Sequence, residues 1–94
     1  MRIYLTSIIK AKEEYLTEVA ETLQNMVTQT SKEDANELYT LHQGIENKNE
    51  FIFYEIWKSE EGLENHNQQN YIKAFGELNE MLQEKPQIYK SYLI

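Results

Sequence analysis

The segment FIFYEIWK at residues 51–58 carries large apolar side chains at both odd and even positions. Alternate residues of a strand point to opposite faces of its sheet, so one face would carry Phe51, Phe53, Glu55 and Trp57. The other face would carry Ile52, Tyr54, Ile56 and Lys58. The segment IYKSYLI at 88–94 is also apolar on both faces. A sheet built on these two strands therefore has to be covered on both sides.

The remaining segments predict how that sheet is assembled. Residues 2–9 and 37–43 have strand-like patterns, and the turn at 44–50 would join 37–43 and 51–58 in a hairpin. Apolar residues at 13–29 recur with a helical period. Ser59 is a candidate N-cap for a second helical stretch that extends to about residue 84 and ends before Pro86, and the polar run at 65–70 predicts a kink or two helices.

This order, βαββαβ, is typical of the ferredoxin-like α+β fold, with an antiparallel sheet and both helices on one face. Two helices cover only one face of the sheet. The simplest cover for the other face is a second copy of the chain, so the sequence predicts a homodimer with its sheets packed face to face.

Length and composition restrict the function classes. A chain of 94 residues predicts one domain, 1–94. The net charge of −7 argues against binding to nucleic acid or to an anionic membrane. There is no Cys, no basic leader before an apolar core, and no apolar run of about 20 residues, so we expect a cytoplasmic protein without disulfides. His66 has no carboxylate three or four residues further along the chain, and Glu46, four residues after His42, lies across the predicted turn, so no metal site is predicted.

One carboxylate and one imidazole could carry chemistry. Glu55 lies between Phe53 and Trp57 on an apolar strand face, where a carboxylate needs a partner. His66 follows after a short turn and could fold back over that strand, so we expect a Glu55–His66 pair. Such a pair could simply satisfy a polar gap in the core, or it could serve as a general base in an apolar pocket.

Two tyrosines are further candidates. Tyr39 and Tyr71 are both placed to point between sheet and helix, where they could be ordinary packing residues. They could instead hydrogen-bond a phenolic or quinone oxygen. The Asn/Gln run at 65–70 is either a solvated helix face or the lip of a pocket.

Three stretches together resemble the antibiotic biosynthesis monooxygenase domain, a family that includes quinol monooxygenases. They are Glu33 followed by Tyr39-Thr40-Leu41, the strand 51–57 with its Glu-x-Trp, and residues 66–75 (HNQQNYIKAF). The resemblance implies a dimeric α+β barrel with a pocket between sheet and helices. It also implies oxygenation of a small aromatic, quinol or polyketide-like substrate by O2, without flavin, haem or metal cofactor.

By this resemblance His66 would act as a base or hydrogen-bond donor and Glu55 would orient it. Tyr39 and Tyr71 would bind substrate oxygens, and Trp57 and Phe75 would form pocket wall. The chain departs from the family pattern at two places. Asp34, Ala35 and Asn36 stand where many members have Pro-Gly-Cys, and Tyr71 stands where many have a second His.

Other functions on the same fold are possible alternatives. One resembles the family's autoinducer-2 degradation branch, which isomerises a phosphorylated metabolite, but Arg2 is the only Arg here. Another is a non-enzymatic domain that binds a hydrophobic metabolite. Haem degradation is not expected, because the Asn, Trp and His of that branch are matched here by Thr6 or Ser7, His66 and Gly76.

Overall fold

Four strands form one antiparallel sheet in the computed structural model, which describes residues 1–94. The sheet order is β2-β3-β1-β4. The strands are β1 (Ile3–Lys10), β2 (Asn36–Gln43), β3 (Glu50–Trp57) and β4 (Gln87–Ser91). β2 and β3 form the predicted hairpin, and β1 lies between β3 and β4. The ferredoxin-like α+β prediction is confirmed.

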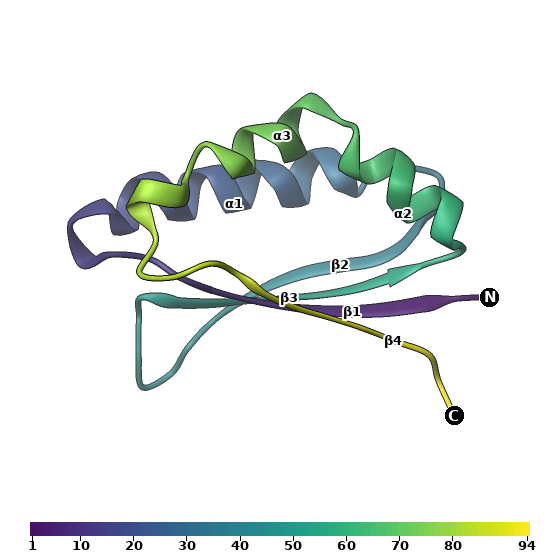
Figure 1. Ribbon diagram of the computed structural model, residues 1–94, viewed down its shortest axis with the longest axis horizontal. Helices are drawn as coiled ribbons and strands as arrows, with labels where there is room; N and C mark the ends of the chain where they lie inside the picture. The colour runs from purple at the N-terminus through teal and green to yellow at the C-terminus, as the bar shows by residue number, and fades with distance from the viewer.

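All the helices lie on one side of this sheet (Figure 1). The first helical segment is a short 3-10 turn, η1 (Glu13–Tyr15), that leads into α1 (Leu16–Thr30). The second comprises α2 (Glu60–Asn67), α3 (Asn70–Gly76) and another 3-10 turn, η2 (Asn79–Met81). Ser59 caps α2 as predicted, since its side chain accepts a hydrogen bond from the backbone N–H of Gly62 at 3.1 Å.

The predicted second helix is divided and shorter than expected. It breaks inside the Asn/Gln run, where Gln69 adopts an extended backbone with φ −71° and ψ 144°. The regular α-helix ends at Gly76, so the expectation that it continues to about residue 84 and stops before Pro86 is wrong. Leu78 and Leu82 are buried beyond that end, and their burial against the sheet is achieved by a turn rather than by a helix.

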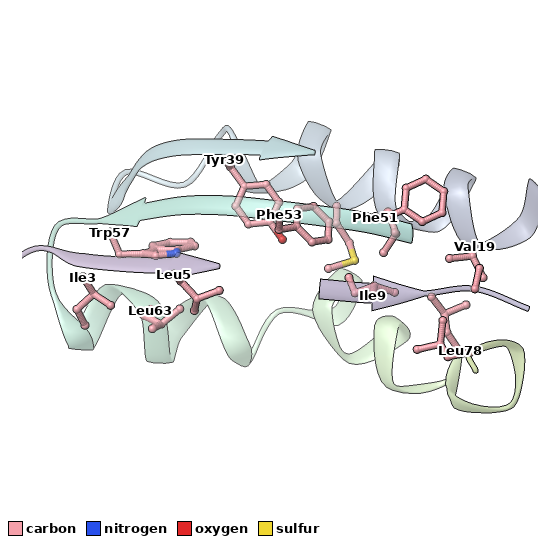
Figure 2. Close-up of a cluster of buried hydrophobic side chains, with 14 residues drawn as sticks. Ile3, Leu5, Ile9, Val19, Tyr39, Phe51, Phe53, Trp57, Leu63 and Leu78 are labelled. Carbon is pink, nitrogen blue, oxygen red and sulfur yellow. The ribbon is translucent and has the colours of Figure 1, made fainter. Parts of the chain in front are cut away.

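The core lies between the sheet and the helices (Figure 2). β1 contributes its odd-numbered residues and β3 its Phe51, Phe53 and Trp57, whose burial follows the alternation of a strand. Val19 and Leu23 from α1 and Leu63 from α2 meet them from the helical layer. This arrangement places Glu55, which shares the inward face of β3, inside the apolar layer.

The opposite face of the sheet has no layer over it, and we call it the open face. Register pairs Tyr4 with Ile56 and Ile8 with Ile52 across the central strands of this face. Tyr54 is 38% exposed there, and Tyr89 of β4 is 57% exposed. The apolar second face predicted for 51–58 is therefore present and uncovered in the single chain.

The last strand is shorter than the predicted 88–94. It spans Gln87–Ser91, and all of its residues are exposed at the edge of the sheet. Leu93 and Ile94 lie beyond it and are exposed as well.

Candidate functional site

The candidate site is built around His66, which is 4% exposed although it is a polar residue. It lies one turn after Leu63 on the buried face of α2, so that the helix directs both side chains toward the sheet. The ring centroid of His66 is 4.5 Å from that of Trp57 on β3 and 5.6 Å from that of Tyr39 on β2. Two strands and one helix therefore hold the imidazole in place.

The carboxylate partner of His66 is Glu33, in the loop between α1 and β2. Its Oε2 lies 2.8 Å from His66 Nδ1. The hydroxyl of Tyr71, in α3, donates a hydrogen bond to the same carboxylate oxygen. Because a carboxylate only accepts hydrogen bonds, His66 carries its proton on Nδ1 and leaves Nε2 with a free lone pair.

The expected Glu55–His66 pair does not form. Glu55 instead accepts a hydrogen bond from Trp57 Nε1, which lies 2.8 Å from its Oε1. Residues two apart on a strand point to the same face, so the Glu-x-Trp spacing brings a carboxylate directly beside an indole N–H that also needs a partner. The Glu-x-Trp spacing in the sequence therefore indicates a contact between Glu55 and Trp57.

Glu33 is the site residue that the local pattern missed. In the sequence it is only the acid that begins the family-like motif, and it lies in a polar connection that has no periodicity. It is separated from His66 by 33 residues, so the contact depends on how the α1–β2 loop lies against α2.

Burial controls the charge of these groups. It lowers the pKa of His66, although the hydrogen bond and charge of Glu33 raise it in part. Burial raises the pKa of Glu55 to about 7, against the opposing effect of the Trp57 hydrogen bond. The pKa of the Tyr39 hydroxyl is raised far above its ordinary value, chiefly by burial and then by the charge of Glu55. Near neutral pH the site thus presents a neutral imidazole, a neutral tyrosine and a carboxyl close to its midpoint.

A cavity of about 250 Å³ adjoins this cluster, between the sheet and the helices. Nine of its fourteen lining residues are hydrophobic, and the others are Ser7, Glu55, His66, Asn67 and Lys90. Tyr39 and Phe75 are among the residues that line it. Its volume is smaller than the roughly 300–1,000 Å³ of drug-sized sites, so it suits a molecule of one or two rings.

Two predicted pocket residues lie elsewhere. Trp57 does not line the cavity, because its indole is fully buried behind His66 and Glu55. Tyr71 is also absent from the lining and contacts Glu33 instead. Trp57 thus contacts Glu55, which lines the cavity, and Tyr71 contacts Glu33, which in turn holds His66. The chain contains no group of three or more His, Cys, Asp or Glu side chains placed to hold a metal ion.

The raised pKa of Glu55 predicts a specific dependence of stability on pH. The folded state favours the protonated carboxyl. The contribution of Glu55 to the free energy of unfolding is therefore fully present at a pH below its pKa in the unfolded chain, and it is lost as the pH rises from about 4.5 to about 7. Glu55→Gln keeps an acceptor for Trp57 but does not titrate. Urea unfolding across pH 4–8 should show the variant gaining on the order of 3 kcal/mol relative to wild type by pH 8. Parallel profiles for the two proteins would contradict the burial of a titrating carboxyl.

Sequence and structure comparisons place the chain among known proteins. Residues 3–78 match the family described as antibiotic biosynthesis monooxygenase. The chain belongs to this family. It is 30% identical over 73 residues to a Bacillus subtilis (strain 168) protein named "Putative monooxygenase YcnE", and the match covers 78% of this chain and 77% of that protein.

Solved structures share the fold along the whole chain. The structure of Rv0793 from Mycobacterium tuberculosis has a TM-score of 0.94 at 16% identity and covers 100% of this chain and 96% of that one. PA3566 from Pseudomonas aeruginosa has a TM-score of 0.92 at 24% identity, with 99% and 94% covered. The recognition made from the motifs is therefore confirmed at the level of family and fold. Separately, no helix of the chain has the length and apolar character needed to cross a membrane.

Proposed function

We propose that this protein is a monooxygenase that oxidises a small hydroxy-aromatic compound, such as a quinol, with O2 and without a cofactor. The observation that carries the proposal is the hydrogen bonding of His66 and the position of its ring. Its Nδ1–H is held by Glu33, while its ring lines an apolar cavity and its Nε2 has no protein hydrogen bond. A base with a free lone pair in a low-dielectric cavity is suited to accept a proton from a phenolic hydroxyl.

The chemistry requires only the substrate and O2. His66 removes a proton from a substrate hydroxyl, and the resulting anion donates electrons to O2. A C–O bond then forms at a ring carbon, the O–O bond breaks, and the second oxygen atom leaves as water with the two hydrogens that the substrate loses. All four electrons that reduce O2 come from the substrate, so a quinol becomes a hydroxyquinone with no external reductant.

The surrounding residues would position the substrate. The Tyr39 hydroxyl stays protonated because burial raises its pKa, so it is available as a donor to a substrate oxygen. Glu55 lines the same cavity and is partly protonated near pH 7, which suits it to return a proton to a departing oxygen. Phe75 would pack against the substrate ring. Trp57 would act through Glu55, and Tyr71 would act through Glu33.

We also propose that the protein works as a homodimer formed through the open face. That face presents Tyr4, Ile8, Ile52, Tyr54 and Ile56 from the two central strands, and a second copy would cover them. The cavity lies on the other side of the sheet, so dimerisation would leave the helical side free to admit substrate.

The test is oxygen consumption with 1,4-dihydroxynaphthalene, measured as the increase over the spontaneous rate. Superoxide dismutase is included to suppress chain autoxidation, and an anaerobic incubation is run in parallel. His66→Ala should reduce the protein-dependent rate by about 100-fold to 10,000-fold, because it removes the general base. His42→Ala is the matched control, since His42 is exposed, does not line the cavity, and makes its side-chain hydrogen bond to Thr40.

Equal rates for wild type and His66→Ala would refute the role of His66. If quinols and simple phenols raise the melting temperature but no oxygen is consumed, the binding-domain alternative is favoured instead. That alternative rests on the same apolar cavity lining.

A further inference from the structure

The cavity contains one positively charged side chain, Lys90, which the proposed chemistry does not use. Lys90 lies on β4 directly opposite Leu5 of β1, and Leu5 lies opposite Glu55 of β3. Glu55 in turn lies opposite Tyr39 of β2. These four residues form one row across the sheet, and all four line the cavity. The row therefore has a cation at its β4 end and hydrogen-bonding groups at its β2–β3 end.

The length of this row matches a small aromatic molecule. Neighbouring strands are about 4.8 Å apart, so the backbones of Lys90 and Glu55, two strands apart, are separated by about 10 Å. The flexible Lys90 side chain can shorten the gap that a ligand has to span. A molecule of one or two fused rings, with polar groups at opposite ends, would reach both ends of the row.

Lys90 is available to such a ligand. The ion pairs of the chain are Arg2–Glu37, Lys10–Glu84 and His66–Glu33, and none involves Lys90. The acidic groups that face it are Glu55, across Leu5, and Glu60, which shares a second hollow with it beside β4. Neither carboxylate lies within ion-pair distance. Lys90 and Ile88 are exposed, so the cavity opens past them at the edge of the sheet.

The positive charge of Lys90 is opposite in sign to the overall charge of the protein. A chain with a net charge of −7 repels anions in general, whereas an unpaired ammonium at the mouth of an apolar cavity attracts them locally. The ring of an aromatic anion would enter the apolar part of the cavity, and its charged group would remain beside Lys90 near solvent.

We propose that Lys90 selects aromatic ligands that carry a carboxylate, which it binds at the cavity mouth while a ring hydroxyl at the far end lies beside His66. The placement of the hydroxyl rests on the proposed function. The role of Lys90 as a specificity residue rests on the register of β4 and on its position in the lining. The substrate class is thus narrowed to hydroxy-aromatic acids.

The test uses binding without turnover. 6-Hydroxy-2-naphthoate carries a carboxylate and a hydroxyl at opposite ends of two fused rings, and 2-naphthol has the same rings without the carboxylate. Wild type should bind the acid at least about 10-fold more tightly than 2-naphthol by isothermal titration calorimetry, because a charge-assisted contact is added. The preference should decrease as salt is raised.

Lys90→Met keeps an apolar stem of similar length and should abolish the preference by weakening the binding of the acid. Lys73→Met, which replaces an exposed lysine outside the cavity lining, should retain the preference. The proposal is overturned if wild type binds the two probes equally, if it binds neither, or if Lys90→Met keeps the preference.

These outcomes are separate from those that test catalysis. A protein that prefers the acid through Lys90 but consumes no oxygen would refute the proposed oxygenase activity and retain the ligand assignment. A protein that oxidises quinols but shows no preference for the acid would support the oxygenase activity and refute the assignment of Lys90.

Discussion

Glu33→Gln is expected to reduce the rate of quinol oxidation by about 100-fold to 10,000-fold, a loss typical of a histidine base that loses its orienting carboxylate. In the wild-type protein one oxygen of Glu33 accepts from both His66 Nδ1 and Tyr71. The neutral amide cannot stabilise the imidazolium that forms when His66 Nε2 takes the substrate proton. If the amide NH2 faces Nδ1, it also forces the ring proton onto Nε2, which removes the lone pair from the cavity.

Two further measurements separate this positioning role from a merely structural one. Glu33 raises the pKa of His66 against the larger effect of burial, so the histidine pKa measured by NMR should fall further in the variant. The nitrogen shifts of the ring should also report the change of tautomer. Asp34→Asn is the control, because Asp34 is the exposed acidic neighbour and makes no hydrogen bond to the site. A Glu33→Gln rate within about threefold of wild type would contradict the role of Glu33.

Ile52→Glu is expected to convert the proposed dimer to a monomer. Ile52 lies on β3 opposite Ile8 of β1, near the centre of the open face. In a dimer the new carboxylate would be buried between two sheets without a partner, whereas in a monomer it would remain in contact with water. We expect the dimer dissociation constant to rise by more than about 100-fold, since an unpaired buried charge costs several kcal/mol per copy.

Light scattering after size-exclusion chromatography at micromolar concentration measures this change as a halving of the mass. Ile45→Glu makes the same substitution at a fully exposed residue of the β2–β3 turn and should leave the mass unchanged. A monomeric wild-type protein would contradict the dimer itself. A dimeric Ile52→Glu variant would indicate that the copies associate through another surface.

Short-range patterns in the sequence accounted for most of the fold. The alternation in 51–58 correctly placed Phe53, Glu55 and Trp57 on the inward face of one strand, and Ser59 marked the start of α2. The polar run at 65–70 correctly indicated a division of the second helix. These features are encoded by residues within a few positions of one another, since strand and helix periods and caps act over one or two turns.

The chemistry of the site depends on contacts between residues that are far apart in the sequence. Glu55 was expected to pair with His66, but the adjacent indole of Trp57 takes its carboxylate. Glu33 and Tyr71 reach the imidazole environment from a loop and from α3. Lys90 joins the cavity only through the pairing of β4 with β1, although 85 positions separate it from Leu5.

The sequence alone was thus sufficient for the order of the elements, the inward faces and the position of the imidazole on its helix. The partner of that imidazole, the residues that line the cavity and the cation at its mouth followed from the packing of distant segments. The reason is that a buried polar group takes whichever partner the assembled layers bring within about 3 Å, and that choice has no local periodicity.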